Sequence, residues 1–215
     1  MAQPRWSRSN PLALAVLVSL YEKPMHPYEI AQTLRSRAKH ESVRLNYGSL
    51  YGVVETLDKK GFIKATGTVR EGKRPQRTVY AITEEGALEM IDWLTELIGT
   101  PTKEYPAFMA GLSFLPALAP DDALAALRRR SEQLVMKLVG LRSAMKTASD
   151  AGLPRIFELE AEYEEHVLEA ELEYVKGLVD EMASGSLEGL DLWQAFHRED
   201  FDPDEVHFTF ELPDG

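Results

Sequence analysis

The chain has 215 residues, 44% of them hydrophobic, which allows one large domain or two small ones with a sizeable core. It contains no cysteine, which excludes disulfides, thiolate zinc sites and cysteine catalysis. The net charge of −11 is unevenly spread: residues 1–80 hold 14 Lys and Arg against 6 Asp and Glu, whereas residues 81–215 hold 10 against 29. A basic first part joined to an acidic remainder indicates that one end meets a polyanion, although a solvated acidic helix would give the same totals.

The first predicted helix begins near Pro11, a residue tolerated in a first turn, and continues as an apolar stripe to Leu20. With Arg5 and Arg8 before it, this run resembles a secretion signal, but no small-residue cleavage site follows. The run is also shorter than the roughly 18 apolar residues of a membrane span. We therefore expect a cytoplasmic protein.

Pro24 and Pro27 interrupt this pattern, and a second helix is predicted from about Tyr28 to near His40. A third helix follows Asn46, whose side chain can cap the free backbone donors of the first turn. The apolar face of this third helix, spaced at i, i+3, i+4 and i+7, is formed by Leu50, Val53, Val54 and Leu57. Polar and aromatic residues at its entry are thus free to point elsewhere.

Two short strands are predicted at 62–68 and 77–83, joined by a basic turn with the sequence Glu71-Gly72-Lys73-Arg74-Pro75. A helix followed by a hairpin with a cationic tip is typical of a winged helix-turn-helix, in which the helix suits a major groove and the tip suits phosphates. Thr83 is expected to cap a fourth helix that runs to about Gly99. Its predicted apolar face consists of Ala87, Ile91, Leu94 and Ile98.

Beyond a boundary near residues 100–102, a short apolar helix is expected, and Pro120 then begins a long helix. Its apolar seam, with one polar interruption, consists of Leu124, Leu127, Ser131, Leu134, Leu138, Leu141 and Met145. A second long helix, ending near Ser184, carries two apolar stripes, and a helix apolar on two sides normally has two neighbours. We therefore infer a second subunit. The last thirty residues predict a short helix, and either an edge strand or a docked tail at 206–212.

These residues together resemble the PadR family of winged-helix transcriptional regulators. The motifs that carry the resemblance are Pro27-Tyr28-Glu29-Ile30, Gly48-Ser49-Leu50-Tyr51, Leu57-Asp58-Lys59-Lys60-Gly61-Phe62-Ile63, and the return strand through Tyr80-Ala81-Ile82-Thr83-Glu84-Glu85-Gly86. The resemblance is specific over about residues 10–90. It implies a homodimer on a pseudo-palindromic operator, usually repressing, and often released by a small aromatic molecule. It also implies that Tyr51 contacts the DNA backbone. The family's basic-aromatic pair before the wing tyrosine is replaced here by Thr78-Val79.

The candidate DNA-binding residues lie at the entry of the third helix and on the wing. They are Asn46, Tyr47, Ser49, Tyr51, Lys64, Lys73, Arg74 and Arg77. Less specific explanations exist for several of them. Asn46 and Ser49 would then only cap the helix, Tyr51 would be a core residue, and the basic turn would simply be solvated.

Two further sets of residues are predicted for ligand and partner contacts. A planar aromatic ligand could stack on Trp93, Phe108, Met109 or Phe114, although ordinary interface packing would use the same residue types. The expected dimerisation residues are Leu127, Leu134, Leu138, Leu141, Val167, Tyr174 and Leu178.

Two segments resemble a phosphate-binding loop and a calcium-binding loop, but each lacks a residue that the motif requires. The run from Gly67 to Lys73 matches the start of a phosphate-binding loop, but Arg74 stands where Ser or Thr should hold magnesium. The acidic residues 200–211 resemble a calcium loop, yet Glu205 stands where the turn demands glycine. We expect no enzyme activity, cofactor or metal.

The sequence thus predicts a mainly α protein with three parts: a winged helix-turn-helix of three helices and a two-stranded wing (1–99), a long-helix dimerisation part (100–184), and an acidic tail (185–215). The expected function is DNA-binding regulation, most simply repression by a homodimer on double-stranded DNA. The alternative is a winged helix that binds another protein through its acidic helical surface.

Overall fold

The computed structural model of the chain describes residues 8–40, 42–69 and 77–198. It is mainly helical, with one two-stranded antiparallel sheet, and it divides into two compact units, Met1–Lys103 and Glu104–Gly215. Among the helices so described, none is both long enough and apolar enough to cross a membrane.

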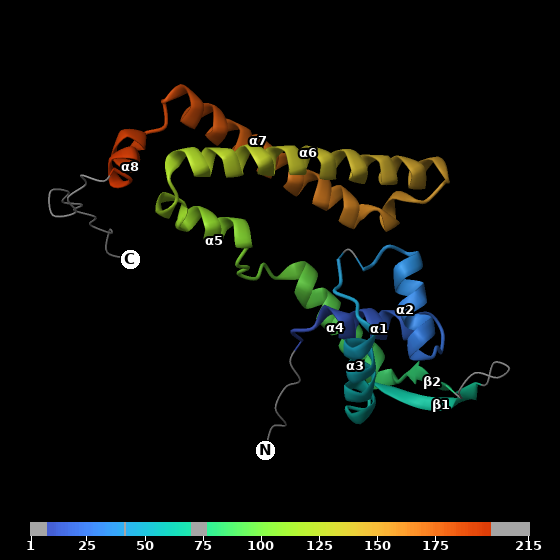
Figure 1. Ribbon diagram of the computed structural model, residues 1–215. Helices are drawn as coiled ribbons and strands as arrows, with labels where there is room; N and C mark the ends of the chain where they lie inside the picture. The colour runs from blue at the N-terminus through green and yellow to red at the C-terminus, as the bar shows by residue number, and fades with distance from the viewer. Residues whose placement is uncertain (1–7, 41, 70–76, 199–215) are drawn as a thin grey trace, which may run out of the picture. The chain divides into compact units, whose positions relative to one another are not determined.

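The first unit is a small helical core with a hairpin projecting from it (Figure 1). Its elements in chain order are α1 (Pro11–Glu22), α2 (Pro27–Ser36), α3 (Tyr47–Lys59), β1 (Ile63–Val69), β2 (Arg77–Ile82) and α4 (Glu84–Gly99). The central helix is α1, which contacts α2, α3, α4 and β2 and is buried over most of its circumference. The predicted start at Pro11 is confirmed, and Asn10 caps the helix by accepting a hydrogen bond from the Leu12 N–H at 3.1 Å.

The second helix ends earlier than the sequence predicts, at Ser36 instead of near His40. The chain turns there because Ala38 adopts a left-handed conformation with φ of 55°. The N–H groups of Ala38 and Lys39 then donate to the carbonyls of Arg35 and Leu34, which closes the end of the helix.

The hairpin is anchored to the helices by a bridge that the sequence did not predict. Met25, in the turn before α2, exchanges two backbone hydrogen bonds with Tyr80 of β2, at 3.0 and 2.9 Å. Within the hairpin, Ile63 pairs with Ile82, and a register shift between Ala65 and Gly67 marks a bulge. The basic tip between the strands lies outside the described residues.

The fourth helix follows Thr83, which caps it as predicted by accepting a hydrogen bond from the Gly86 N–H at 3.0 Å. The predicted apolar face of this helix is wrong. Its buried residues are Gly86, Met90 and Trp93, whereas the predicted face is largely exposed; Ile98, for example, is 86% exposed. The reason lies in Gly86, which brings the helix backbone so close to β1 that a side chain there would meet the Phe62 carbonyl oxygen at 1.9 Å.

The second unit is built on a long antiparallel helical hairpin formed by α6 and α7 (Figure 1). Its elements are α5 (Ala107–Ser113), the 3₁₀ turn η1 (Leu115–Ala117), α6 (Pro120–Asp150), the 3₁₀ turn η2 (Arg155–Phe157), α7 (Leu159–Ser184) and α8 (Leu190–Phe196). The predicted starts and ends at Pro120 and Ser184 are confirmed, and Gly185 ends α7 with a left-handed φ of 77°.

The seam predicted on α6 forms the core of this hairpin together with one of the two α7 stripes. Its most buried members are Leu127, Leu134 and Leu138 on α6, and Leu168 and Val175 on α7. The short helix predicted after residue 185 is confirmed as α8, which contributes Leu190 and Trp193 to the same core; the Trp193 indole N–H donates to the Leu118 carbonyl at 2.8 Å. The strand or docked tail predicted at 206–212 lies outside the described residues.

Candidate nucleic-acid interface

The start of α3 presents polar and aromatic side chains to solvent because the opposite face of the helix is in the core. Leu50 and Leu57 are fully buried, whereas Asn46, Tyr47 and Ser49 are exposed. The Asn46 side-chain oxygen accepts a hydrogen bond from the Ser49 N–H at 2.7 Å, so the predicted cap is confirmed. Its amide NH₂ has no hydrogen-bond partner among the described residues and keeps its two donors.

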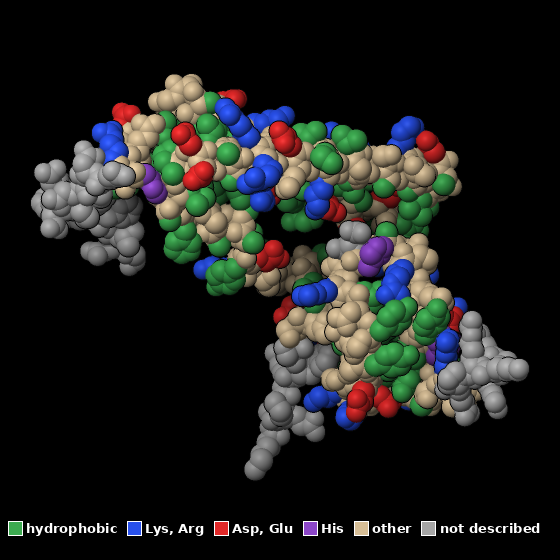
Figure 2. Space-filling view, viewed as in Figure 1, with side chains coloured by type: hydrophobic (Ala, Val, Ile, Leu, Met, Phe, Trp, Pro, Cys, Tyr) green, Lys and Arg blue, Asp and Glu red, His purple; other side chains and the backbone are tan. Residues whose placement is uncertain are grey.

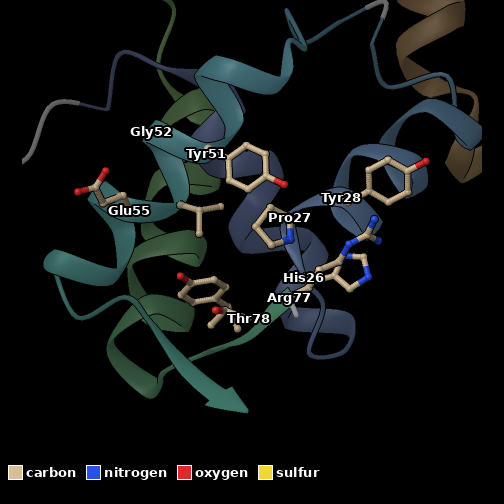
Figure 3. Close-up of a pocket in the computed structure, with 10 residues that line it drawn as sticks. His26, Pro27, Tyr28, Tyr51, Gly52, Glu55, Arg77 and Thr78 are labelled. Atoms are coloured by element: carbon tan, nitrogen blue, oxygen red, sulfur yellow. The ribbon is translucent and has the colours of Figure 1, made fainter. Parts of the chain in front are cut away.

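Tyr51, which could have been a core residue, is 53% exposed. Its ring extends from α3 toward Pro27 and lines a cleft formed by α2, α3 and the start of β2 (Figure 3). The cleft has a volume of about 430 Å³, and its lining residues are His26, Pro27, Tyr28, Tyr51, Gly52, Val54, Glu55, Arg77, Thr78 and Tyr80. Burial raises the pKa of the Tyr80 hydroxyl, as do the nearby carboxylates of Asp58 and Glu55, so this group is neutral at physiological pH.

Beside the cleft, four side chains from three elements are stacked in a row. The Tyr28 and Tyr47 rings lie 6.1 Å apart with an interplanar angle of 11°. The Arg77 guanidinium lies 4.6 Å from the centre of the Tyr28 ring, and the Arg35 guanidinium lies 4.5 Å from the centre of the Tyr47 ring. Arg35 also donates to the Tyr47 hydroxyl at 2.5 Å, and the Gln32 amide donates to the Tyr28 hydroxyl at 3.1 Å.

The two arginines of this row keep their charge available. Within residues 8–40, 42–69 and 77–198, no carboxylate lies within ion-pair distance of Arg35 or Arg77. Some other cations of the same unit are neutralised, as in the pair of Arg37 with Glu22 at 2.5 Å. Figure 2 shows hydrophobic side chains, flanked by Lys and Arg, on the surface around α2 and α3.

The only carboxylate among the cleft residues is also paired. Glu55 accepts a hydrogen bond from the Lys59 ammonium one turn later, at 2.6 Å, and this bond lowers the pKa of Glu55. The cleft lining therefore combines aromatic rings with the Arg77 guanidinium, and its one described acid is countered by a neighbouring lysine. Such a surface suits a phosphate backbone.

The structure brings together part of the predicted DNA-binding set. Asn46, Tyr47, Ser49 and Tyr51 are all exposed near the start of α3, and Arg77 is linked to Tyr47 through the stacked row. Lys64 is exposed on β1, outside the cleft lining, and Lys73 and Arg74 lie outside the described residues. Tyr28 and Arg35 were not on the predicted list, although both stand on the second helix of a recognised helix-turn-helix pattern.

The predicted ligand and dimer residues lie in several environments. Trp93, assigned to a ligand, is 1% exposed in the core of the first unit, so its faces are not available to stack a ligand; this assignment is corrected. In the second unit, Phe108 is half-buried with the Arg130 guanidinium 3.8 Å from its ring centre, while Met109 and Phe114 are exposed.

The predicted dimer contacts are also divided between two surfaces. Leu127, Leu134 and Leu138 pack against α7 of their own chain, so their assignment to a partner contact is corrected; Leu141 is partly buried in the same core. The second α7 stripe is different. Val167 is 45% exposed and Tyr174 is 55% exposed, while Leu178 is half-buried.

Comparison with known proteins places this geometry in context. Residues 16–92 match the model of the Transcriptional regulator PadR-like family. The chain is 29% identical over 89 residues to the "Probable transcriptional regulator Rv1176c" of Mycobacterium tuberculosis. That match covers 41% of this chain and 46% of the other, so the chain spans about half the length of the curated relative it matches.

Three solved structures share the fold. Bacillus subtilis PadR in complex with operator DNA aligns with a TM-score of 0.68 at 17% identity, over 80% of this chain and 99% of that one. The same protein in complex with p-coumaric acid aligns at 0.64 and 16%, over 83% and 98%. The Vibrio cholerae virulence activator AphA aligns at 0.62 and 15%, over 80% and 98%.

Proposed function

We propose that the chain, whose residues 16–92 match the model of the PadR-like family of transcriptional regulators, acts as a homodimer on a pseudo-palindromic DNA operator and represses the adjacent gene. The observation that carries the proposal is the set of exposed side chains at the N-terminal end of α3. There, Asn46, Tyr47, Ser49 and Tyr51 point outward, beside two arginines that no described carboxylate neutralises.

In this proposal α3 enters the major groove with its first turn leading, and the wing tip lies on the phosphate backbone. Arg35 and Arg77 flank the helix entry, where they contact phosphates on either side of the groove. The solved complex of B. subtilis PadR with operator DNA, which shares the fold, supports operator DNA as the partner.

A homodimer supplies two such helices, which meet successive major grooves when they are about 34 Å apart. The α6–α7 hairpin supports this assembly because it keeps one apolar stripe on α7 uncovered. On α6, Met136 is 74% exposed and Val139 is 63% exposed. A second copy of the hairpin would remove these side chains from water, which stabilises the pair.

We further propose a small aromatic effector that releases the operator, held in the second unit by Phe108, Met109 and Phe114. The complex of B. subtilis PadR with p-coumaric acid supports an effector of this class. We expect p-coumaric acid added to the operator complex to lower its affinity, measured by fluorescence anisotropy. Unchanged affinity at saturating concentrations would remove this compound from the proposal.

The contribution of the wing is tested by the salt dependence of DNA binding. Lys73→Ala and Arg74→Ala should each weaken binding to all sequences and reduce the slope of log K against log salt by about one. Lys146→Ala is the matched control, because it removes the same charge from an α6 lysine whose partner is Asp150 at 3.0 Å. A slope that stays at the wild-type value in both wing variants would mean that the wing does not contact the DNA phosphate backbone.

The role of Asn46 as a DNA contact can be separated from its role as a cap. Asn46→Asp keeps a side-chain oxygen for the Ser49 N–H and adds an anion where the helix dipole favours one, so stability should hold or rise slightly. The same change removes the amide donors and brings a negative charge to the phosphates, and it should weaken operator binding at least about tenfold. Anisotropy and thermal unfolding measure the two effects. Equal operator affinity in both proteins would restrict Asn46 to capping.

A further inference from the structure

We propose that Tyr28 and Tyr47 are positioning residues for DNA binding. Their stacked rings hold Arg35 and Arg77 in place for phosphate contact, and they link the base of the wing to α3, the helix that enters the major groove in the proposed function. This inference rests on the proposed DNA-binding function and goes beyond it, because neither the helix pattern nor the predicted contact set assigns a role to Tyr28. The four side chains come from α2, α3 and β2, the three elements that form the exposed cationic surface.

The choice of partner explains how the arginines can be ordered and still charged. A carboxylate that fixes a guanidinium also cancels its charge, as Glu22 does for Arg37. An aromatic ring attracts the guanidinium through its quadrupole and leaves the net charge in place. One N–H group of the Arg35 guanidinium donates a hydrogen bond to the Tyr47 hydroxyl. The other guanidinium N–H groups have no hydrogen-bond partner among the described residues.

Holding these side chains before DNA arrives lowers the cost of binding. A free arginine loses its rotamer freedom when it contacts a phosphate, and an arginine already seated on a ring has lost much of it in the unbound protein. Tyr28 is half-buried and its hydroxyl accepts from Gln32, so the ring that seats Arg77 is itself fixed.

The backbone places Tyr28 and Arg77 opposite each other. Met25, in the turn before α2, forms an isolated antiparallel bridge with Tyr80 of β2, and this bridge fixes the start of α2 against the hairpin. Tyr28 is three residues after Met25, and Arg77 is three residues before Tyr80. The bridge therefore holds the first turn of α2 near the start of β2, where Arg77 lies over the Tyr28 ring, and Tyr47, the first residue of α3, extends the stack to α3.

A double-mutant cycle on operator binding tests the proposal. Tyr28→Leu removes the ring and should weaken binding about tenfold, while Tyr28→Phe keeps the ring and should stay within about twofold of wild type. Arg77→Gln should lower affinity and salt slope in the wild-type background, and clearly less when Leu occupies position 28. Tyr21→Leu, at an α1 tyrosine that is 59% exposed, is the matched control and should change nothing.

A second cycle keeps the test valid if Tyr28→Leu does not fold, which thermal unfolding of each variant reveals. Tyr47 is 40% exposed, so Tyr47→Leu should be tolerated, and it should reduce the effect of Arg35→Gln in the same way. Additive effects in the cycles, or a Phe variant as weak as the Leu variant, overturn the positioning role. Wild-type protein that shows no operator preference instead overturns the proposed function itself.

Discussion

Replacing Gly86 with alanine is expected to destabilise the first unit by about 3 kcal/mol or more, which lowers its Tm by roughly 12 °C or more. An added Cβ at this position would lie 1.9 Å from the Phe62 carbonyl oxygen and 2.8 Å from its carbon. Both are backbone atoms of the turn into β1, so neither can rotate away. Relief requires α4 to move off the hairpin, which exposes Met90 and Trp93. Thermal unfolding followed by tryptophan fluorescence measures the loss.

Gly52→Ala is the matched control in the same unit. Gly52 lies in the middle of α3 with no atom within 4 Å of an added Cβ, so alanine there should stabilise the unit by about 0.5–1 kcal/mol. The two substitutions are chemically identical, and they should shift the Tm in opposite directions. If the Gly86→Ala protein has the same Tm as the wild type, α4 does not pack against β1 as described.

Placing glutamate at both Val167 and Tyr174 is expected to convert the proposed homodimer into monomers and to weaken operator binding by at least about a hundredfold. The two side chains lie one heptad apart on the exposed stripe of α7, so a partner helix would have to bury both new charges. A monomer contacts one half-site and loses the gain in effective concentration that the second half-site provides. Sedimentation velocity measures the assembly, and anisotropy measures the affinity.

Lys176→Glu is the control for this pair, since it also adds an acid to α7 but on a different flank of the helix, at an exposed position. It should leave both assembly and affinity near the wild-type values. A double variant that remains dimeric would move the interface away from the α7 stripe, and the exposed apolar face of α4, which includes Leu88 and Ile91, would become the surface to examine.

Local signals were sufficient to predict most elements and their ends. Asn46 and Thr83 cap the helices that they were expected to cap, because capping depends on one side chain and the backbone within three residues. The buried face of α3 follows from the spacing of four apolar residues. The winged helix-turn-helix in the first unit therefore needed little tertiary information.

The errors occur where packing outweighs the hydrophobic pattern. On α4, counting apolar side chains favoured Ile91 and Ile98, but Gly86 determines which face approaches the hairpin, and a residue without a side chain adds nothing to such a count. On α6 and α7 the pattern identified the apolar stripes without indicating which stripe the chain covers itself. Leu134 and Leu138 were consequently assigned to a partner.

The stacked row beside the cleft was missed for a similar reason. Tyr28 and Tyr47 are 19 positions apart and meet only after α2 and α3 have packed, and Arg77 joins from a third element. The pairing of Met25 with Tyr80 carries no strong sequence signal, because a single bridge needs only backbone groups. Contacts of this kind depend on the fold, whereas caps and stripes depend on the local sequence.

DNase footprinting of the full chain on the DNA upstream of its own gene, at physiological salt and with excess competitor DNA, determines whether the protein binds a specific operator as a dimer. We expect protection of two related half-sites whose centres lie one helical turn, about 34 Å, or a multiple of that distance apart. Protection should weaken when Asn46→Asp replaces the wild type. Absence of any protected sequence, with binding only in dilute salt and no preference among fragments, would contradict the account and favour a winged helix that binds another protein.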